Sequence, residues 1–177
     1  MRRRTFLSAL TLPLAPTAAF AAGELSNRRA PGFALQDQDL KTHDLADYMG
    51  KVVVIDIMRT ACPHCATFSQ KLQQAEKAFG GRVKVLQVVN PPDNQASVKK
   101  YRADHGLSTT ILWDCSQMAI SYLKVTPQKP TIEVPHVFVV DTKGWIREDY
   151  GYNLLSRGIF EGDGLMPVLE KYAPKTA

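Results

Sequence analysis

Apolar residues in this chain gather in short continuous runs that alternate with stretches of helical spacing. The run over residues 52–58 is nearly all β-branched and contains one acid, Asp56. Such a run is typical of a strand covered on both faces, as in a parallel sheet. Residues 83–89 form a second run of this kind. Residues 68–79 lie between them with helical spacing and end at two glycines, which predicts a β-α-β unit.

Further elements are predicted on the C-terminal side of this unit. Residues 98–105 have the spacing of an amphipathic helix, and residues 111–113 form a short strand. Asp114 is expected to cap the next helix, with a glutamine three residues on completing a capping box. Residues 137–150 predict a β-hairpin and residues 165–172 a terminal helix. This order favours an α/β fold with a central sheet and helices on both faces.

The N-terminal residues have the pattern of an export signal. Three arginines at positions 2–4 precede an apolar stretch that runs from Phe6 to about Ala22, which is short for a membrane span and is interrupted by two prolines. Small residues at positions 19–21 suit cleavage by a signal peptidase. The arginines resemble a twin-arginine signal, and an ordinary Sec signal or an uncleaved anchor are the alternatives. Either export route predicts a periplasmic or otherwise exported bacterial protein.

The remaining chain predicts one domain. We expect a signal peptide over residues 1–21, a polar tether over 22–30 and the folded domain over 31–177. Within the domain, residues 36–41 read as a polar turn and residues 45–48 as one helical turn. Removal of residues 1–21 takes away three arginines, so the formal net charge of +5 falls to 5 − 3 = +2. This small charge gives no argument for nucleic-acid binding.

The chemistry of the chain points to its cysteines. Cys62-Pro63-His64-Cys65 comes directly after a predicted strand and opens a predicted helix. Pro63 suits the first turn, where its missing N–H is not needed. The free N–H groups of that turn and a protonated His64 both favour a thiolate at Cys62, which is the attacking species in disulfide exchange. Cys65, about one turn on and facing inward, is expected to resolve the mixed disulfide.

Two other uses of the pair compete with this interpretation. A structural disulfide with a two-residue spacer would constrain the unfolded chain little. A structural zinc site needs four ligands, and the chain has only one further cysteine, Cys115. Cys115 is expected to be a small buried residue rather than a second redox thiol. No haem attachment motif follows Cys65, and Arg59 stands where peroxiredoxins need a threonine.

Residues from about 31 to 172 resemble the thioredoxin superfamily, and within it the exported TlpA/ResA-like branch. The segment from Phe33 to Val52 is similar to the N-terminal extension of that branch, and residues 87–114 to its inserted helix and strand. The resemblance implies a thioredoxin-like fold, with a central mixed β-sheet flanked by helices. The segment around Val134-Pro135 resembles the superfamily's cis-proline loop. The resemblance therefore implies that Pro135 is cis beside the cysteines and that the Val134 backbone pairs with an extended substrate segment.

The resemblance also gives Asp56 a role. In thioredoxin the matching position, inside the strand before the cysteines, is a buried aspartate. Burial of an unpaired carboxylate raises its pKa, which suits a proton acceptor that helps to deprotonate Cys65. The alternative is a strand-edge acid with ordinary partners.

Some residues depart from the family pattern. Ala61 precedes the first cysteine where many relatives have tryptophan, and Phe68 replaces the acid that apocytochrome-reducing relatives carry. The Cys-Pro-His-Cys sequence and the Val-Pro pair are similar to the oxidant DsbA, but the chain lacks room for the helical insertion of DsbA. The direction of electron flow is therefore left open.

The sequence thus predicts a thiol–disulfide oxidoreductase with no cofactor other than a redox-active Cys62–Cys65 disulfide. Its expected partners are cysteine-containing exported proteins and a membrane or periplasmic redox partner, with no nucleic acid, no bound metal and no transmembrane segment after signal cleavage. The alternative is a copper-binding protein or metallochaperone of the same fold that uses Cys62, Cys65 and His136 as ligands.

Overall fold

A computed structural model defines residues 23–173 of the 177-residue chain, so the signal peptide expected over residues 1–21 lies outside the described residues. Eight strands form one sheet in the order β1-β8-β7-β4-β5-β6-β2-β3. The strands are β1 Arg28–Arg29, β2 Ala34–Asp37, β3 Thr42–Asp44, β4 Val52–Met58, β5 Val83–Val89, β6 Thr110–Trp113, β7 His136–Val140 and β8 Trp145–Gly151. The helices are η1 Leu45–Tyr48, α1 Pro63–Ala78, α2 Gln95–His105, α3 Gln117–Leu123, α4 Arg157–Phe160 and α5 Leu165–Tyr172. Within the described residues, no helix is both long enough and apolar enough to cross a bilayer.

The centre of the sheet is parallel and covered on both faces. Strand β4 pairs in parallel with β5, which in turn pairs in parallel with β6. Strand β7 lies antiparallel on the other side of β4 and forms a hairpin with β8. Every residue of β4 is buried, which confirms the prediction from its continuous apolar run. Helix α1 supplies the crossover that a parallel β4–β5 pair requires.

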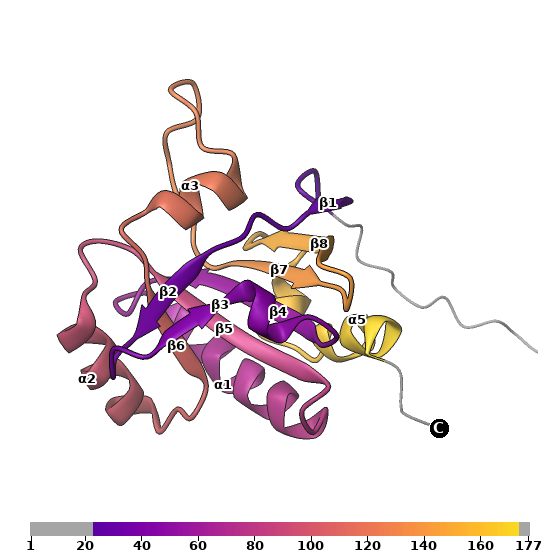
Figure 1. The fold of residues 1–177 in the computed structure, drawn as a ribbon, viewed down its shortest axis with the longest axis horizontal. Coiled ribbons are helices and arrows are strands. Elements are labelled where there is room, and N and C mark those ends of the chain that lie inside the picture. The colour runs from indigo at the N-terminus through magenta and orange to yellow at the C-terminus, as the bar shows by residue number, and fades with distance from the viewer. Residues whose placement is uncertain (1–22, 174–177) are drawn as a thin grey trace, which may run out of the picture.

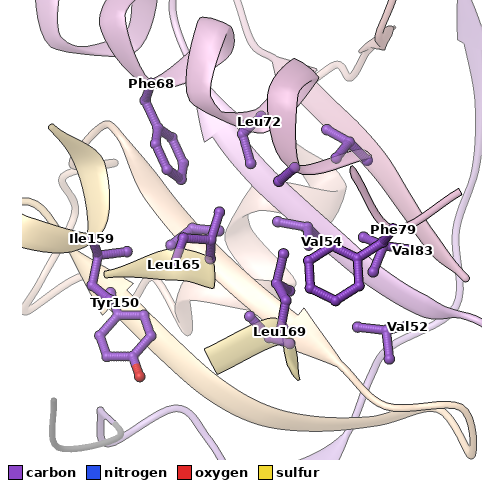
Figure 2. Packing of buried hydrophobic residues seen from close by; sticks show 14 of the residues in the cluster. Val52, Val54, Phe68, Leu72, Phe79, Val83, Tyr150, Ile159, Leu165 and Leu169 are labelled. Atoms are coloured by element: carbon purple, nitrogen blue, oxygen red, sulfur yellow. The ribbon is translucent and has the colours of Figure 1, made fainter. Parts of the chain in front are cut away.

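One face of the sheet is covered by α1, α2, α4 and α5. Figure 2 shows Phe68 and Leu72 projecting from α1 toward Leu165 and Leu169 of α5, with alternate residues of the strands beneath them. The Phe68 ring lies 4.7 Å from that of Phe160, measured between centroids. Because side chains alternate along a strand, Asp56 points to this same face as Val52 and Val54. Its position places a carboxyl under helix α1.

The other face is covered by α3 and by the single turn η1. Met118, Ala119 and Tyr122 of α3 pack on the alternate residues of β4, β5 and β7. Figure 1 shows α3 on the opposite side of the sheet from α1 and α2. Helices therefore lie on both faces, as predicted.

The segment that we expected to be a tether is part of the sheet. Arg28 and Arg29 pair with Ile146 and Trp145 of β8, and the Gly23 N–H donates to the carbonyl oxygen of Asp149. The guanidinium of Arg28 donates to the carbonyl oxygen of Tyr122. A polar sequence can add an edge strand because the sheet edge supplies main-chain partners whatever the side chains.

Two local predictions are also corrected. The expected polar turn over residues 36–41 starts inside β2, which forms a hairpin with β3 and adds to the free edge of β6. Asp114 does not cap its helix through a capping box with Gln117. Its carboxylate instead accepts from the N–H groups of Met118 and Ala119, because α3 begins two residues later than the pattern indicated.

Candidate active site at the start of helix α1

The turn from β4 into α1 holds the two cysteines one helical turn apart. Cys62 is the N-cap residue of α1, Pro63 is the first helical residue, and the Cys65 N–H donates to the sulfur of Cys62 at 3.2 Å. A sulfur in this place faces the positive end of the helix dipole and receives one of its free N–H groups. Both interactions are of the kind that stabilises negative charge on a sulfur.

The loop before Cys62 is fixed by a residue that sequence analysis missed, Asp93. Its carboxylate accepts from the Thr60 N–H at 3.0 Å, from the Thr60 hydroxyl, and from the hydroxyl of Ser97 at 2.9 Å. Asp93 is buried and lies just after β5. No motif links positions 60 and 93, because the contact depends on the parallel pairing of β4 and β5.

The two cysteines differ in their access to solvent. Both are free thiols, Cys62 is partly exposed and Cys65 is fully buried. Burial raises the pKa of the Cys65 thiol strongly, and the charge of Asp56 and a hydrogen bond with Cys62 raise it further. Cys65 therefore needs a proton acceptor before it can attack, whereas Cys62 can meet another molecule.

Asp56 is near enough to Cys65 for its charge to raise the pKa of that thiol. It is fully buried in β4, and Oδ2 accepts from the amide of Gln87 at 3.0 Å. Burial raises its pKa to about 7, and the Gln87 hydrogen bond opposes that rise. The raised pKa agrees with the expectation from the resemblance. A carboxyl that titrates near neutrality can take up and release a proton under ordinary conditions.

The loop that leads into β7 closes the site from the other side. The Val134–Pro135 peptide bond is cis, as the resemblance implied. Pro135 is buried, and Val134 packs in the same apolar cluster as Cys62 and Cys65. The antiparallel pairing of β7 with β4 brings this loop, more than 60 residues away in sequence, to the end of β4.

His64 has partners that the sequence did not suggest. Its ring is half exposed and stacks on Tyr152 with 4.2 Å between centroids, and Nδ1 lies 3.2 Å from Glu161 Oε1. Glu161 is held in turn by the hydroxyl of Tyr152 and by Arg157, both at 2.5 Å. These contacts hold the pKa of Glu161 below its usual range. A protonated His64 therefore adds less net positive charge near Cys62 than the isolated motif predicted.

This arrangement makes Glu161→Gln a test of the charge around the site. Loss of the carboxylate removes a negative charge from the surroundings of His64 and Cys62, which favours negative charge on the Cys62 sulfur. A more stable reduced form raises the reduction potential, and because solvent screens these charges we expect only a small rise. Redox equilibrium with glutathione buffers measures it. Asp163→Asn is the matched control, since Asp163 lies in the same loop as Glu161 and pairs with Lys71 of α1. An equal shift in both variants would contradict the assignment.

The ligand set of the copper alternative is not assembled. His136 pairs in register with Ile57 of β4, so its side chain points to the α3 face, away from α1. There its Nε2 lies 3.5 Å from Asp149 Oδ2. Within the part of the chain that the structure describes, no three His, Cys, Asp or Glu side chains form a group that could hold a metal ion.

One further residue, Cys115, differs from its expected place, and another, Phe68, accounts for a departure from the family pattern. Cys115 is exposed just before α3 and not buried as expected. Phe68, at the position where some relatives carry an acid, is fully buried against Phe160. An acid there would lie in the apolar cluster under α1, so the departure from the family pattern belongs to the packing of this core.

The fold and the site together define a class of protein. A mixed sheet flanked by helices, a Cys-x-x-Cys pair at the start of the first core helix and a cis-proline loop beside it are the features of a thioredoxin-like protein. The sequence profile of the AhpC/TSA family matches residues 26–149. The chain therefore belongs to the AhpC/TSA family.

Individual relatives agree with this placement. The thiol-disulfide oxidoreductase ResA of Geobacillus thermodenitrificans is 24% identical over 119 residues, which are 67% of this chain and 65% of that protein. The match thus spans just under two thirds of the length of that relative. The thioredoxin domain of a Bacteroides vulgatus thiol-disulfide oxidoreductase has a TM-score of 0.67 at 18% identity, over 84% of this chain and 97% of that domain. A thiol:disulfide interchange protein of Chlorobium tepidum has a TM-score of 0.68 at 17% identity, over 82% and 96%. These structures confirm the thioredoxin-like fold.

Proposed function

We propose that this protein is a thiol–disulfide oxidoreductase that exchanges disulfides with exported protein substrates through Cys62 and Cys65. One observation carries the proposal: a partly exposed cysteine caps α1, and a buried cysteine one turn behind it donates its N–H to the first sulfur at 3.2 Å. The relatives named ResA support the same activity. A peroxidase function is disfavoured because Arg59 occupies the place of the required threonine.

The reaction begins at Cys62. Its thiolate attacks one sulfur of a substrate disulfide, forms a mixed disulfide and releases the second substrate sulfur as a thiolate. Cys65 then gives its proton to Asp56, and the Cys65 thiolate attacks the sulfur of Cys62. This step closes the Cys62–Cys65 disulfide and releases the first substrate sulfur. The reverse sequence transfers the disulfide to a reduced substrate, and the cysteine pair is the redox group in both directions.

The loop at Val134-Pro135 is the proposed substrate platform. Val134 packs beside both cysteines, and an extended segment that pairs with its backbone would bring a substrate sulfur to Cys62. Pro63 and His64 adjust the thiolate through the helix turn and through charge. These proposed roles favour a cysteine-containing segment in an extended conformation as the substrate.

The proposed place of action is outside the bacterial cytoplasm. The three arginines at positions 2–4 and the apolar stretch that follows them support export. Outside the cytoplasm an oxidising compartment provides proteins with disulfides as substrates. Turnover also requires a second redox partner, membrane-bound or periplasmic, that restores the starting state of the cysteine pair.

Exchange assays test the proposal. The purified protein should catalyse the reduction of insulin disulfides or the oxidation of a reduced protein, and Cys115→Ser should do so equally well. In the Cys115→Ser background, limiting iodoacetamide should label Cys62 and spare the buried Cys65, and the label should stop exchange. No exchange in either direction would retire the proposal. Tight, stoichiometric uptake of Cu(I) that His136→Ala abolishes would favour the copper alternative instead.

A further inference from the structure

A buried polar network lies behind Cys65, and Gln87 is at its centre. Gln87 in β5 is paired in register with Asp56 in β4, and both are fully buried. The Gln87 Nε2 lies 3.0 Å from Asp56 Oδ2 and 2.7 Å from Ser69 Oγ, with the sulfur of Met58 at 3.1 Å. No sequence motif singles out Gln87, since it is a single glutamine in an apolar strand.

The network fixes which end of the Gln87 amide faces Asp56. The hydroxyl of Thr109 donates to Gln87 Oε1 at 3.0 Å, so the carbonyl end is occupied and the N–H end turns toward the carboxyl. Ser69 donates its one hydroxyl proton to the carbonyl oxygen of Cys65 at 2.9 Å, so the Tyr101 hydroxyl, also at 2.9 Å, is a donor to Ser69. Gln87 therefore donates one amide proton to Asp56 Oδ2 and the other to Ser69 Oγ.

One atom in this network has no hydrogen-bond partner among the described residues, Asp56 Oδ1. Buried polar atoms in folded proteins are usually paired, so an unpaired oxygen on a buried carboxyl calls for an explanation. A catalytic role is one such explanation. Gln87 holds Oδ2 and leaves Oδ1 free for a proton. The charge of Asp56 acts on the thiol of Cys65, which is fully buried.

We propose that Gln87, oriented by Thr109, is the positioning residue that fixes Asp56 so that Oδ1 takes the proton from Cys65. The inference rests on the proposed exchange reaction and adds a residue to it. Gln87 stabilises the carboxylate with an N–H, and without it Asp56 holds its proton more tightly. Among the described residues, the titratable groups that interact with Asp56 are Cys65 on α1 and Tyr101 on α2, whereas β7 presents the apolar Val137 and β5 the neutral Gln87.

Gln87→Met tests the proposal with a side chain of similar volume that cannot donate. We expect the pH at which the carboxyl carbon of Asp56 titrates, followed by NMR in the reduced protein, to rise by about one unit, since a hydrogen bond to a charged group is worth about one to two pH units. The closure of a Cys62 mixed disulfide by Cys65 should then slow about tenfold below pH 7 and return toward the wild-type rate at high pH. Asp56→Asn identifies the titrating signal.

A second pair of variants tests the orienting role of Thr109 without changing Gln87. Thr109→Val should shift the Asp56 titration upward by a smaller amount, and Thr109→Ser, which keeps the hydroxyl, should restore the wild-type midpoint. An Asp56 midpoint that stays unchanged in both Gln87→Met and Thr109→Val would overturn the proposal, as would a closure rate lowered equally at every pH. The NMR titration uses no substrate, so a protein without exchange activity but with shifted midpoints would refute the proposed function and not the role of Gln87.

Discussion

Replacing Cys62 with serine is expected to reduce thiol–disulfide exchange to the uncatalysed background, a loss of at least about a thousandfold against the millionfold or greater accelerations typical of enzymes. A serine hydroxyl stays protonated at neutral pH, so it can neither attack a disulfide sulfur nor leave from one. The helix start and the N–H of Cys65 that stabilise the thiolate remain, but they have no thiolate to act on. Insulin reduction and reduced-protein oxidation, each at several enzyme concentrations, measure the loss.

Cys65→Ser is the matched variant, because it removes the buried thiol and keeps Cys62. It should still attack substrates and then stall as a mixed disulfide, since no second thiol is placed to release Cys62. Non-reducing electrophoresis should show this complex with Cys65→Ser and none with Cys62→Ser. A complex formed equally by both variants, or through Cys115, would contradict the assignment of Cys62 as the attacking thiol.

The sequence anticipated the parts of the site that follow from local pattern. The run over Val52–Met58 predicted a buried strand, and the two glycines after Phe79 predicted the end of α1. The placement of the Cys62–Cys65 motif directly after the strand predicted that it lies at the start of the helix. Each of these features depends on neighbours within a few residues, where sequence spacing and physical distance agree.

The parts that the sequence did not reveal depend on contacts between distant segments. Asp93, Glu161 and Gln87 reach the site through the pairing of β4 with β5 and through the packing of α4 near the start of α1. His136 was placed near the cysteines because it follows Pro135, but one residue along a strand reverses the face to which a side chain points. Strand register, which periodicity alone does not give, places Gln87 beside Asp56 and turns His136 away from the cysteines.

The N-terminal segment and Cys115 show a different limit. The polar composition of residues 22–30 predicted a tether, yet Arg28 and Arg29 pair with the edge of β8 through main-chain hydrogen bonds that need no apolar side chain. Cys115 was expected to be buried on general preference, but it lies in the loop before α3, where the helix starts later than its capping pattern indicated. The tendency of a residue type to be buried is least informative where a loop meets a helix or a strand.

Replacing Asp56 with asparagine is expected to stabilise the protein at high pH and to leave its stability near pH 4 almost unchanged. Asp56 has a folded pKa of about 7 against an ordinary value of 3.8, because burial disfavours its charge. A raised pKa means that the folded state holds the proton more tightly than the unfolded state does. Its contribution to stability is complete below about pH 4 and is lost as the pH rises through about 7.

The size of that loss follows from the shift of about three pH units, at about 1.4 kcal/mol each, which makes about 4 kcal/mol between pH 4 and pH 8. Asparagine carries no charge, and its oxygen can still accept from Gln87, so the variant avoids the loss. Denaturant unfolding of the reduced proteins from pH 4 to pH 8 should give curves that coincide at low pH and separate by about 3–4 kcal/mol at high pH. Asp163→Asn, which changes an exposed acid, should follow the wild type throughout. Curves for Asp56→Asn and wild type that stay parallel over the whole range would show that Asp56 is ionised normally in the fold, and the role of this carboxyl as the proton acceptor for Cys65 would then lose its physical basis.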